Sequence, residues 1–233
     1  MKTIGLLGGM SWESTALYYQ TINRAVRDAN PSGDGLSSAP IILNSIDFAP
    51  MAKWQRENDW AAAGQFLAQQ AQILEAAGAQ TLGLCTNTMH KIFDVVAGAV
   101  SIPMLHIASP TIAALKAAGV TRAGFLGTQF SMSERFLLDE YAKHDIALIV
   151  PNAAQQAVAH DIIMRELCQG VVSDTSRAAY VRMIDDLAAQ GAEALVLGCT
   201  EITLLIQPND CALSLFDTAD LHAKALAAFC LTD

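Results

Sequence analysis

Residues 76–88 read AAGAQTLGLCTNT, and residues 189–202 read AQGAEALVLGCTEI. In both stretches a short apolar run ends in a Cys-Thr pair, which begins at Cys85 and at Cys199. Two further pairs of segments match in the same order: TIGLLGGMSWES (3–14) with RAGFLGTQFSMS (122–133), and IPMLHIA (102–108) with LSLFDTA (213–219). Three matches in register indicate that the chain consists of two homologous halves.

Short β-rich runs alternate with Ala-rich stretches along the chain. Stretches such as 61–79 and 176–192 carry apolar residues at helical spacing. Apolar strands separated by helices are typical of parallel sheets that are covered on both faces. We therefore predict an α/β fold of two pseudo-symmetric lobes, each a three-layer unit around a parallel sheet. The predicted strands are 3–8, 39–46, 81–85, 103–107, 122–127, 146–151, 194–199 and 213–217.

The composition argues against several classes of function. A net charge of −9 and scattered basic residues argue against nucleic acid and anionic membrane surfaces as partners. The five cysteines lack zinc-type spacing, so we predict free thiols and no metal. The first apolar run superficially suggests a signal peptide, but Gly8 and Gly9 interrupt it. No later apolar run is long enough to span a membrane. We expect a cytoplasmic, reduced protein.

The two Cys-Thr pairs suggest acid–base chemistry. In open parallel sheets the ligand crevice lies at the carboxyl ends of the strands, where both Cys85 and Cys199 are predicted. A duplicated unit would place the two thiols on opposite sides of one ligand, in a cleft between the lobes. One thiolate could then remove a proton from a carbon atom while the other thiol protonates the opposite face, which inverts the stereocentre. We expect a helix to open at each pair, with N–H groups that favour the thiolate.

Polar residues near the cysteines are candidates for binding a carboxylate. The segments after the thiols offer hydrogen-bond donors, and two Gly-containing loops, 8–12 and 127–128, allow close approach to a small anion. Glu201 could contact a substrate ammonium, orient Cys199 or cap a helix. His90 could tune a thiol or lie on a helix surface, and His106 could face the cleft or satisfy a backbone group. The predicted donors are Thr86, Asn87, Thr88, Thr128 and Thr200.

Three motifs together resemble the cofactor-independent aspartate/glutamate racemase superfamily over essentially the whole length: GLLGGMSWEST (5–15), CTNTMHK (85–91) and LGCTEI (197–202). The similarity is greatest to the bacterial broad-specificity amino-acid racemases. It implies catalysis by Cys85 and Cys199, no pyridoxal phosphate and a homodimer. It also implies that the last strand of each half crosses to the other lobe, which gives lobes of 1–101 plus 212–233 and of 102–211. The substrate contacts that it implies are Met10 with the adjoining Ser11 and Trp12, Gln55, residues 86–88 and Thr200.

One departure from the family pattern bears on the substrate. Aspartate-specific members are expected to hold the side-chain carboxylate with an Arg after the second strand and a Lys in the second half. Here residues 41–53 contain no Arg, and residues 144–223 contain no Lys, although Arg56 or Arg165 could substitute. The DSGxGG opening of the dedicated glutamate racemases is also absent. These features favour neutral or polar amino acids.

Other readings of the sequence remain open. They are an aspartate- or glutamate-selective racemase, an enzyme that isomerises or decarboxylates a small dicarboxylic acid, and a non-catalytic regulatory protein that binds amino acids or carboxylates. Two retained cysteines argue against a decarboxylase, which needs only one proton donor, and against a module that has lost its chemistry.

Overall fold

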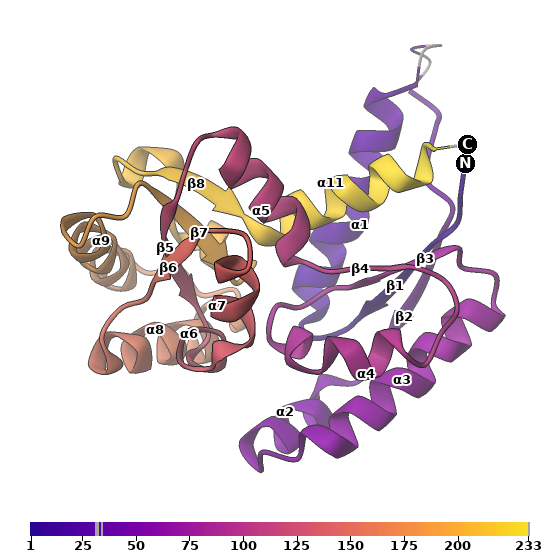
Figure 1. The fold of residues 1–233 in the computed structure, drawn as a ribbon, viewed down its shortest axis with the longest axis horizontal. Helices are drawn as coiled ribbons and strands as arrows, with labels where there is room; N and C mark the ends of the chain where they lie inside the picture. The colour runs from indigo at the N-terminus through magenta and orange to yellow at the C-terminus, as the bar shows by residue number, and fades with distance from the viewer. Residues whose placement is uncertain (31–32, 34, 233) are drawn as a thin grey trace. The chain divides into compact units, whose positions relative to one another are not determined.

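The computed structural model describes residues 1–30, 33 and 35–232, and it contains two parallel sheets flanked by helices (Figure 1). The strand order is β2-β1-β3-β4 in the first sheet and β6-β5-β7-β8 in the second, and every neighbouring pair is parallel. All eight predicted strands are confirmed. They are β1 (Ile4–Gly8), β2 (Ile41–Ser45), β3 (Thr81–Leu84), β4 (Met104–Leu105), β5 (Arg122–Gly127), β6 (Ala147–Ile149), β7 (Ala194–Gly198) and β8 (Ser214–Asp217).

The matching strand orders confirm two similar α/β lobes. The helices of the first are α1 (Trp12–Asp28), α2 (Phe48–Arg56), α3 (Trp60–Ala76), the 3₁₀ turn η1 (Thr88–Ile92), α4 (Phe93–Ala97) and nearly all of α11 (Thr218–Cys230). The second contains α5 (Ala108–Ala117), α6 (Gln129–Ser133), α7 (Arg135–Ala142), α8 (Ala153–Arg165), η2 (Leu167–Gln169), α9 (Asp174–Ala189), α10 (Ile202–Leu205) and η3 (Pro208–Asp210).

The chain passes between the two compact units after each fourth strand, not before it. Residues 108–218 form one unit, and residues 1–107 with the segment from Ala219 form the other. The boundaries predicted from the sequence, 101/102 and 211/212, assigned both of these strands to the wrong unit. The physical reason is the pairing: β4 aligns Met104 with Leu82 of β3, and β8 aligns Ser214 with Ala194 of β7. Each strand completes its own sheet, so it is the following helix that changes units.

The first sheet is covered on both faces. Leu6 and Leu7 are neighbours in β1, and successive strand residues point to opposite faces. Leu6 packs in a cluster with residues of α1 and α11, such as Ile22 and Leu226, whereas Leu7 packs with residues of α3, such as Leu67. This alternation gives the predicted three layers. The second unit has its own core around β5 and β7.

Candidate functional site

Cys85 directly follows β3 at the carboxyl edge of the first sheet. Its backbone N–H donates to the carbonyl of Leu7 at 3.0 Å, which fixes the residue beside β1. The side chain is completely buried, and its Sγ lies 3.8 Å from the carbonyl oxygen of Gly83. Because burial disfavours the charged form, the pKa of this thiol is raised above its ordinary value. Cys85 is therefore a protonated thiol at neutral pH in the unliganded protein.

Cys199 directly follows β7, the strand that occupies the place of β3 in the second sheet. It is partly exposed, and its Sγ donates a hydrogen bond to Oε2 of Glu201 at 2.9 Å. Burial and the neighbouring carboxylate of Glu201 both raise the pKa of this thiol. The structure therefore favours the reading in which Glu201 orients Cys199. Glu201 makes no side-chain capping bond to α10.

The expected N–H groups do not make either thiol a ready thiolate: the backbone N–H of Glu201 acts to lower the pKa of Cys199, but burial outweighs it, and burial raises the pKa of Cys85 as well. The Cys85 segment leads only into the 3₁₀ turn η1, and α10 after Cys199 has four residues. A macrodipole needs several aligned turns, so neither element offsets the desolvation of the sulfur. Both thiols need a bound substrate or a nearby proton acceptor before one of them can act as a base.

The first Gly-containing loop is held by backbone geometry and capping. Gly9 has a φ of +93°, and a Cβ at this position would lie 2.2 Å from the carbonyl oxygen of Ile46. The following Met10–Ser11 peptide bond is cis, and Met10 is buried. Ser11 is the N-cap of α1, while Trp12 is 67% exposed. The role of these three residues toward a substrate stays a prediction.

The residues after Cys85 form a buried polar segment. Asn87 and Thr88 are buried, and Thr86 is half-buried. Gln55 of α2, which was expected at the site only because of the family resemblance, is also buried, and its Nε2 lies 4.0 Å from Sδ of Met89. The structure therefore brings Gln55 to the segment that carries the predicted donors.

His90 holds this segment in place. The backbone N–H of Ile107 donates to its Nε2 at 3.0 Å, so this nitrogen is unprotonated. Its Nδ1 must then carry the proton and donate to the carbonyl of Thr86 at 2.8 Å. Burial, followed by the nearby His106 and His222, holds the pKa of His90 well below its ordinary value. His90 is a buried, neutral support rather than a helix-surface residue.

His222 is a functional-site neighbour that the sequence did not reveal. It is buried on α11, where Nε2 donates to the carbonyl of Leu105 at 2.9 Å and Nδ1 accepts from the hydroxyl of Tyr18 at 2.8 Å. Burial lowers its pKa to about 4. His106 is half-buried, with its ring centroid 4.6 Å from that of His90. His222 and Tyr18 lie far apart in the sequence, so no local pattern announces their pairing.

In the second unit, the predicted donors are engaged within the protein. Thr200 is buried, and its hydroxyl donates to Glu201 at 3.1 Å. Thr128 caps α6 by accepting from the N–H of Ser131 at 3.3 Å. Thr128 therefore has a structural role here, and its contact with a substrate stays a prediction.

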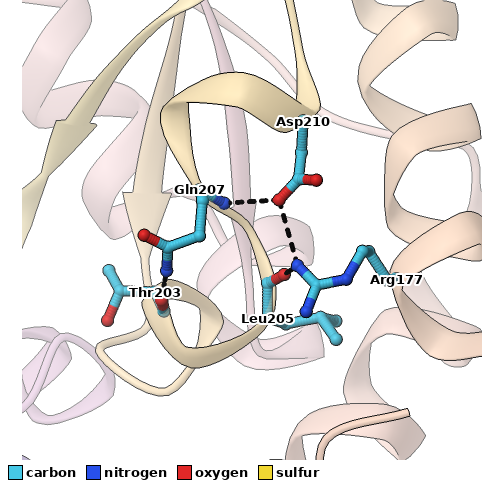
Figure 2. A network of polar contacts seen from close by, with 5 residues as sticks. All are labelled: Arg177, Thr203, Leu205, Gln207 and Asp210. Atoms are coloured by element: carbon cyan, nitrogen blue, oxygen red, sulfur yellow. Dashed lines mark hydrogen bonds and ion pairs between the residues drawn. The ribbon is translucent and has the colours of Figure 1, made fainter. Parts of the chain in front are cut away.

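A network shown in Figure 2 fixes the chain that follows α10. Arg177 of α9 donates to the carbonyl of Leu205 and to Oδ2 of Asp210, the latter at 3.0 Å. The same Asp210 oxygen accepts from the backbone N–H of Gln207 at 2.7 Å, and the Gln207 amide donates to the carbonyl of Thr203. Arg177 was not predicted as a site residue. It anchors the segment that begins at Cys199.

The placement of the cations bears on the substrate. None of the 14 Lys and Arg residues, all of which lie in the described part of the chain, is buried. The two candidate substitutes for a carboxylate clamp, Arg56 and Arg165, are both exposed, and Arg165 pairs with Asp161 at 3.4 Å. Among the described residues, no group of His, Cys, Asp and Glu side chains is arranged to hold a metal ion. No helix in that part of the chain is both long and apolar enough to cross a membrane.

The chain is similar to known proteins across both units. The family model described as Asp/Glu/Hydantoin racemase matches residues 7–226. A candidate Asp/Glu racemase of Yersinia pestis is 43% identical, with a TM-score of 0.92 and full coverage of both chains. An aspartate racemase homologue from Pyrococcus horikoshii OT3 is 29% identical, also with full coverage of both chains and with a TM-score of 0.86. The Picrophilus torridus aspartate racemase shares the fold at 18% identity, with a TM-score of 0.80 over 99% of this chain and 94% of that one.

Proposed function

The chain belongs to the Asp/Glu/hydantoin racemase family, a family of isomerases, and from this premise we propose that it racemises free amino acids by proton transfer through Cys85 and Cys199, without pyridoxal phosphate. One observation carries the proposal. Each cysteine directly follows the third strand of its unit, at the carboxyl edge of a sheet whose strand order is repeated in the other unit. This is the edge at which parallel sheets bind ligands.

In the proposed reaction, the thiolate of one cysteine takes the Cα proton and becomes a thiol. The electron pair left on the substrate spreads into its carboxylate, which gains enolate-like charge. Hydrogen-bond donors among residues 86–88 and Thr200 stabilise this charge. The thiol of the other cysteine then protonates the opposite face of Cα and becomes a thiolate. Such general acid and base steps each contribute about 10²–10⁴-fold to the rate.

We propose a broad preference for neutral and polar amino acids, as in the bacterial broad-specificity racemases. The absence of any buried Lys or Arg supports this preference, since a second substrate carboxylate taken out of water needs a cationic partner. The alternative is an aspartate- or glutamate-selective racemase. It requires that exposed Arg56 or Arg165 turn toward the substrate.

Exchange of the α-proton in D₂O tests the proposal. Wild type, Cys85→Ser and Cys199→Ser would each be incubated with L- and D-amino acids and followed by NMR and chiral chromatography. We expect wild type to deuterate Cα and invert its configuration, and each variant to lose racemisation by at least about 10²-fold. The substrate panel separates neutral from acidic amino acids. If no amino acid exchanges, the proposal is wrong.

A second candidate is a non-catalytic protein that binds amino acids or carboxylates. The raised pKa values of both thiols favour it, because a binding protein has no need of a thiolate. Calorimetric binding without α-proton exchange would support this candidate. We also propose a cytoplasmic location, from the cysteine pattern and composition, and a homodimer, from the family resemblance alone. Light scattering coupled to gel filtration tests the dimer.

A further inference from the structure

We propose that Glu201 is a positioning residue that holds Cys199 in the protonated state, so that Cys199 starts the reaction as the proton donor. This inference deepens the proposed function and rests on it for its catalytic meaning. The arrangement itself, however, is a property of the unliganded protein and is measurable without turnover.

The first argument is geometric. Sγ of Cys199 lies 2.9 Å from Oε2 of Glu201, which is a short contact for a sulfur donor. Glu201 as a residue is only 5% exposed, so water screens the charge of its carboxylate poorly. Its Oε2 also accepts from the hydroxyl of Thr200 at 3.1 Å, which fixes the rotamer that faces the sulfur. An ionised carboxylate can only accept a hydrogen bond, so the proton between the two groups belongs to Cys199.

The second argument is the asymmetry between the halves. The first half reads Cys85-Thr86-Asn87, and the second reads Cys199-Thr200-Glu201. The position two residues after the cysteine therefore carries a neutral amide in one half and a carboxylate in the other. A two-base racemase needs one thiol and one thiolate at the start of each turnover. A carboxylate beside only one sulfur gives the two cysteines different protonation preferences.

The groups around Cys199 do not cancel this effect. Burial contributes most to the raised pKa of Cys199, and the Glu201 carboxylate and Cys168 of η2 raise this pKa further. Tyr180 of α9 is also influenced by Cys199, Cys168, Glu166 and Glu201, and it is a neutral phenol at physiological pH because burial raises its pKa. Only the backbone N–H of Glu201 opposes the carboxylate.

Cys85 is a thiol in the unliganded protein, so it first releases its proton to water as the substrate binds. As a thiolate it then removes the Cα proton, and its S–H bond forms as the C–H bond breaks. The S–H bond of Cys199 then breaks as its proton joins the opposite face of Cα. The new Cys199 thiolate lies against the Glu201 carboxylate, and this repulsion favours its reprotonation. Glu201 thus acts through Cys199 without touching the reacting carbon.

The test is the pH dependence of alkylation at Cys199 by iodoacetamide, followed by mass spectrometry of the Cys199 peptide. Wild type, Glu201→Gln and Glu193→Gln would be compared. Glu193 lies just before β7, at its opposite end, so this variant removes one negative charge from the same unit without touching the thiol. We expect Glu201→Gln to shift the midpoint of the pH dependence of Cys199 alkylation to lower pH, while Glu193→Gln leaves this midpoint in place.

An unchanged or raised midpoint for Cys199 in Glu201→Gln overturns the proposal, since a raised midpoint would mean that Glu201 activates the thiol as a base. If this variant does not fold, wild type still decides: a Cys199 midpoint at or below about 8.5, the value of a free cysteine, overturns the proposal. Because alkylation needs no substrate, the shift can appear even if racemisation does not. The two proposals therefore fail separately.

Discussion

Gly9 is the single residue on which the first substrate loop depends most. Its φ of +93° is costly for any residue with a Cβ, and that Cβ would lie 2.2 Å from the carbonyl oxygen of Ile46. We expect Gly9→Ala to lower the free energy of unfolding by about 3 kcal/mol and to abolish activity. The measurement is urea denaturation followed by circular dichroism.

Gly119 provides the matched control for this prediction. It has a φ of +72°, but a Cβ there would meet nothing within 4 Å. Gly119→Ala should therefore cost only the backbone term of about 1–2 kcal/mol and leave racemisation unchanged. Equal losses in the two variants would show that the contact with Ile46 contributes nothing.

His222 should make the protein sensitive to acid. Its folded pKa of about 4 lies below the unfolded value of 6.5, so the unfolded chain binds more protons between these values. The stability from neutral His222 is complete above pH 6.5 and is lost as the pH falls toward 4. This loss amounts to about 3 kcal/mol. We expect His222→Gln, which does not titrate, to reduce the pH dependence of unfolding in this window.

The control for His222→Gln is His144→Gln, because His144 is exposed on a turn of the other unit. That variant should retain the full pH dependence of wild type. Denaturation in urea at intervals between pH 7 and pH 4 gives the slopes, and identical slopes in wild type and His222→Gln would contradict the assignment.

At the scale of the elements, Arg177 of α9 supports the segment that begins at Cys199. The bonds of Arg177 to Leu205 and Asp210 are partly shielded from water, so we expect Arg177→Met to destabilise the protein by about 1–2 kcal/mol. Amide hydrogen exchange should rise specifically in residues 199–210. Arg182→Met on the same helix is the control, because Arg182 is exposed. Equal exchange in both variants would argue against an anchoring role.

The strands were predictable from the sequence, whereas the crossings between units were not. Buried parallel strands are continuous apolar runs, and this pattern is local, as in β1 and β7. Which sheet β4 joins depends on its pairing with Leu82 and Gly83, about twenty residues away, and no local pattern encodes that partner. The same limit applies to α11, whose Leu226 packs against Gly83.

The candidate site was predictable only in part, for the same reason. The repeat located Cys85 and Cys199 at strand ends, because strand ends follow from local patterns. The bond between Cys199 and Glu201 depends on a side-chain rotamer, and the Tyr18–His222 pair depends on the packing of α1 against α11. Such contacts are set by tertiary structure. The burial that raises the pKa of both thiols is also set by tertiary structure, so the sequence did not reveal it.

For the whole molecule, the two units should differ in their ability to fold alone. Every residue of the second unit's hydrophobic core lies between Ala108 and Phe216, so this core is complete within one continuous segment. We expect a chain of residues 108–218 to fold by itself, with cooperative thermal unfolding and protected amides in β5 and β7. A non-cooperative transition would contradict this expectation.

Residues 1–107 alone should not fold, because one face of the first sheet is covered partly by α11. Ala223, Leu226 and Ala227 pack there beside α1, and without them Gly83 loses its neighbour. A missing helix leaves apolar surface exposed, which favours aggregation. His222 lies 2.9 Å from the carbonyl oxygen of Leu105, so the start of α11 is close to the end of β4. A short Gly/Ser linker that joins residue 107 directly to Ala219 should therefore restore cooperative unfolding. If the joined chain unfolds no more cooperatively than residues 1–107, the first unit depends on contacts outside itself.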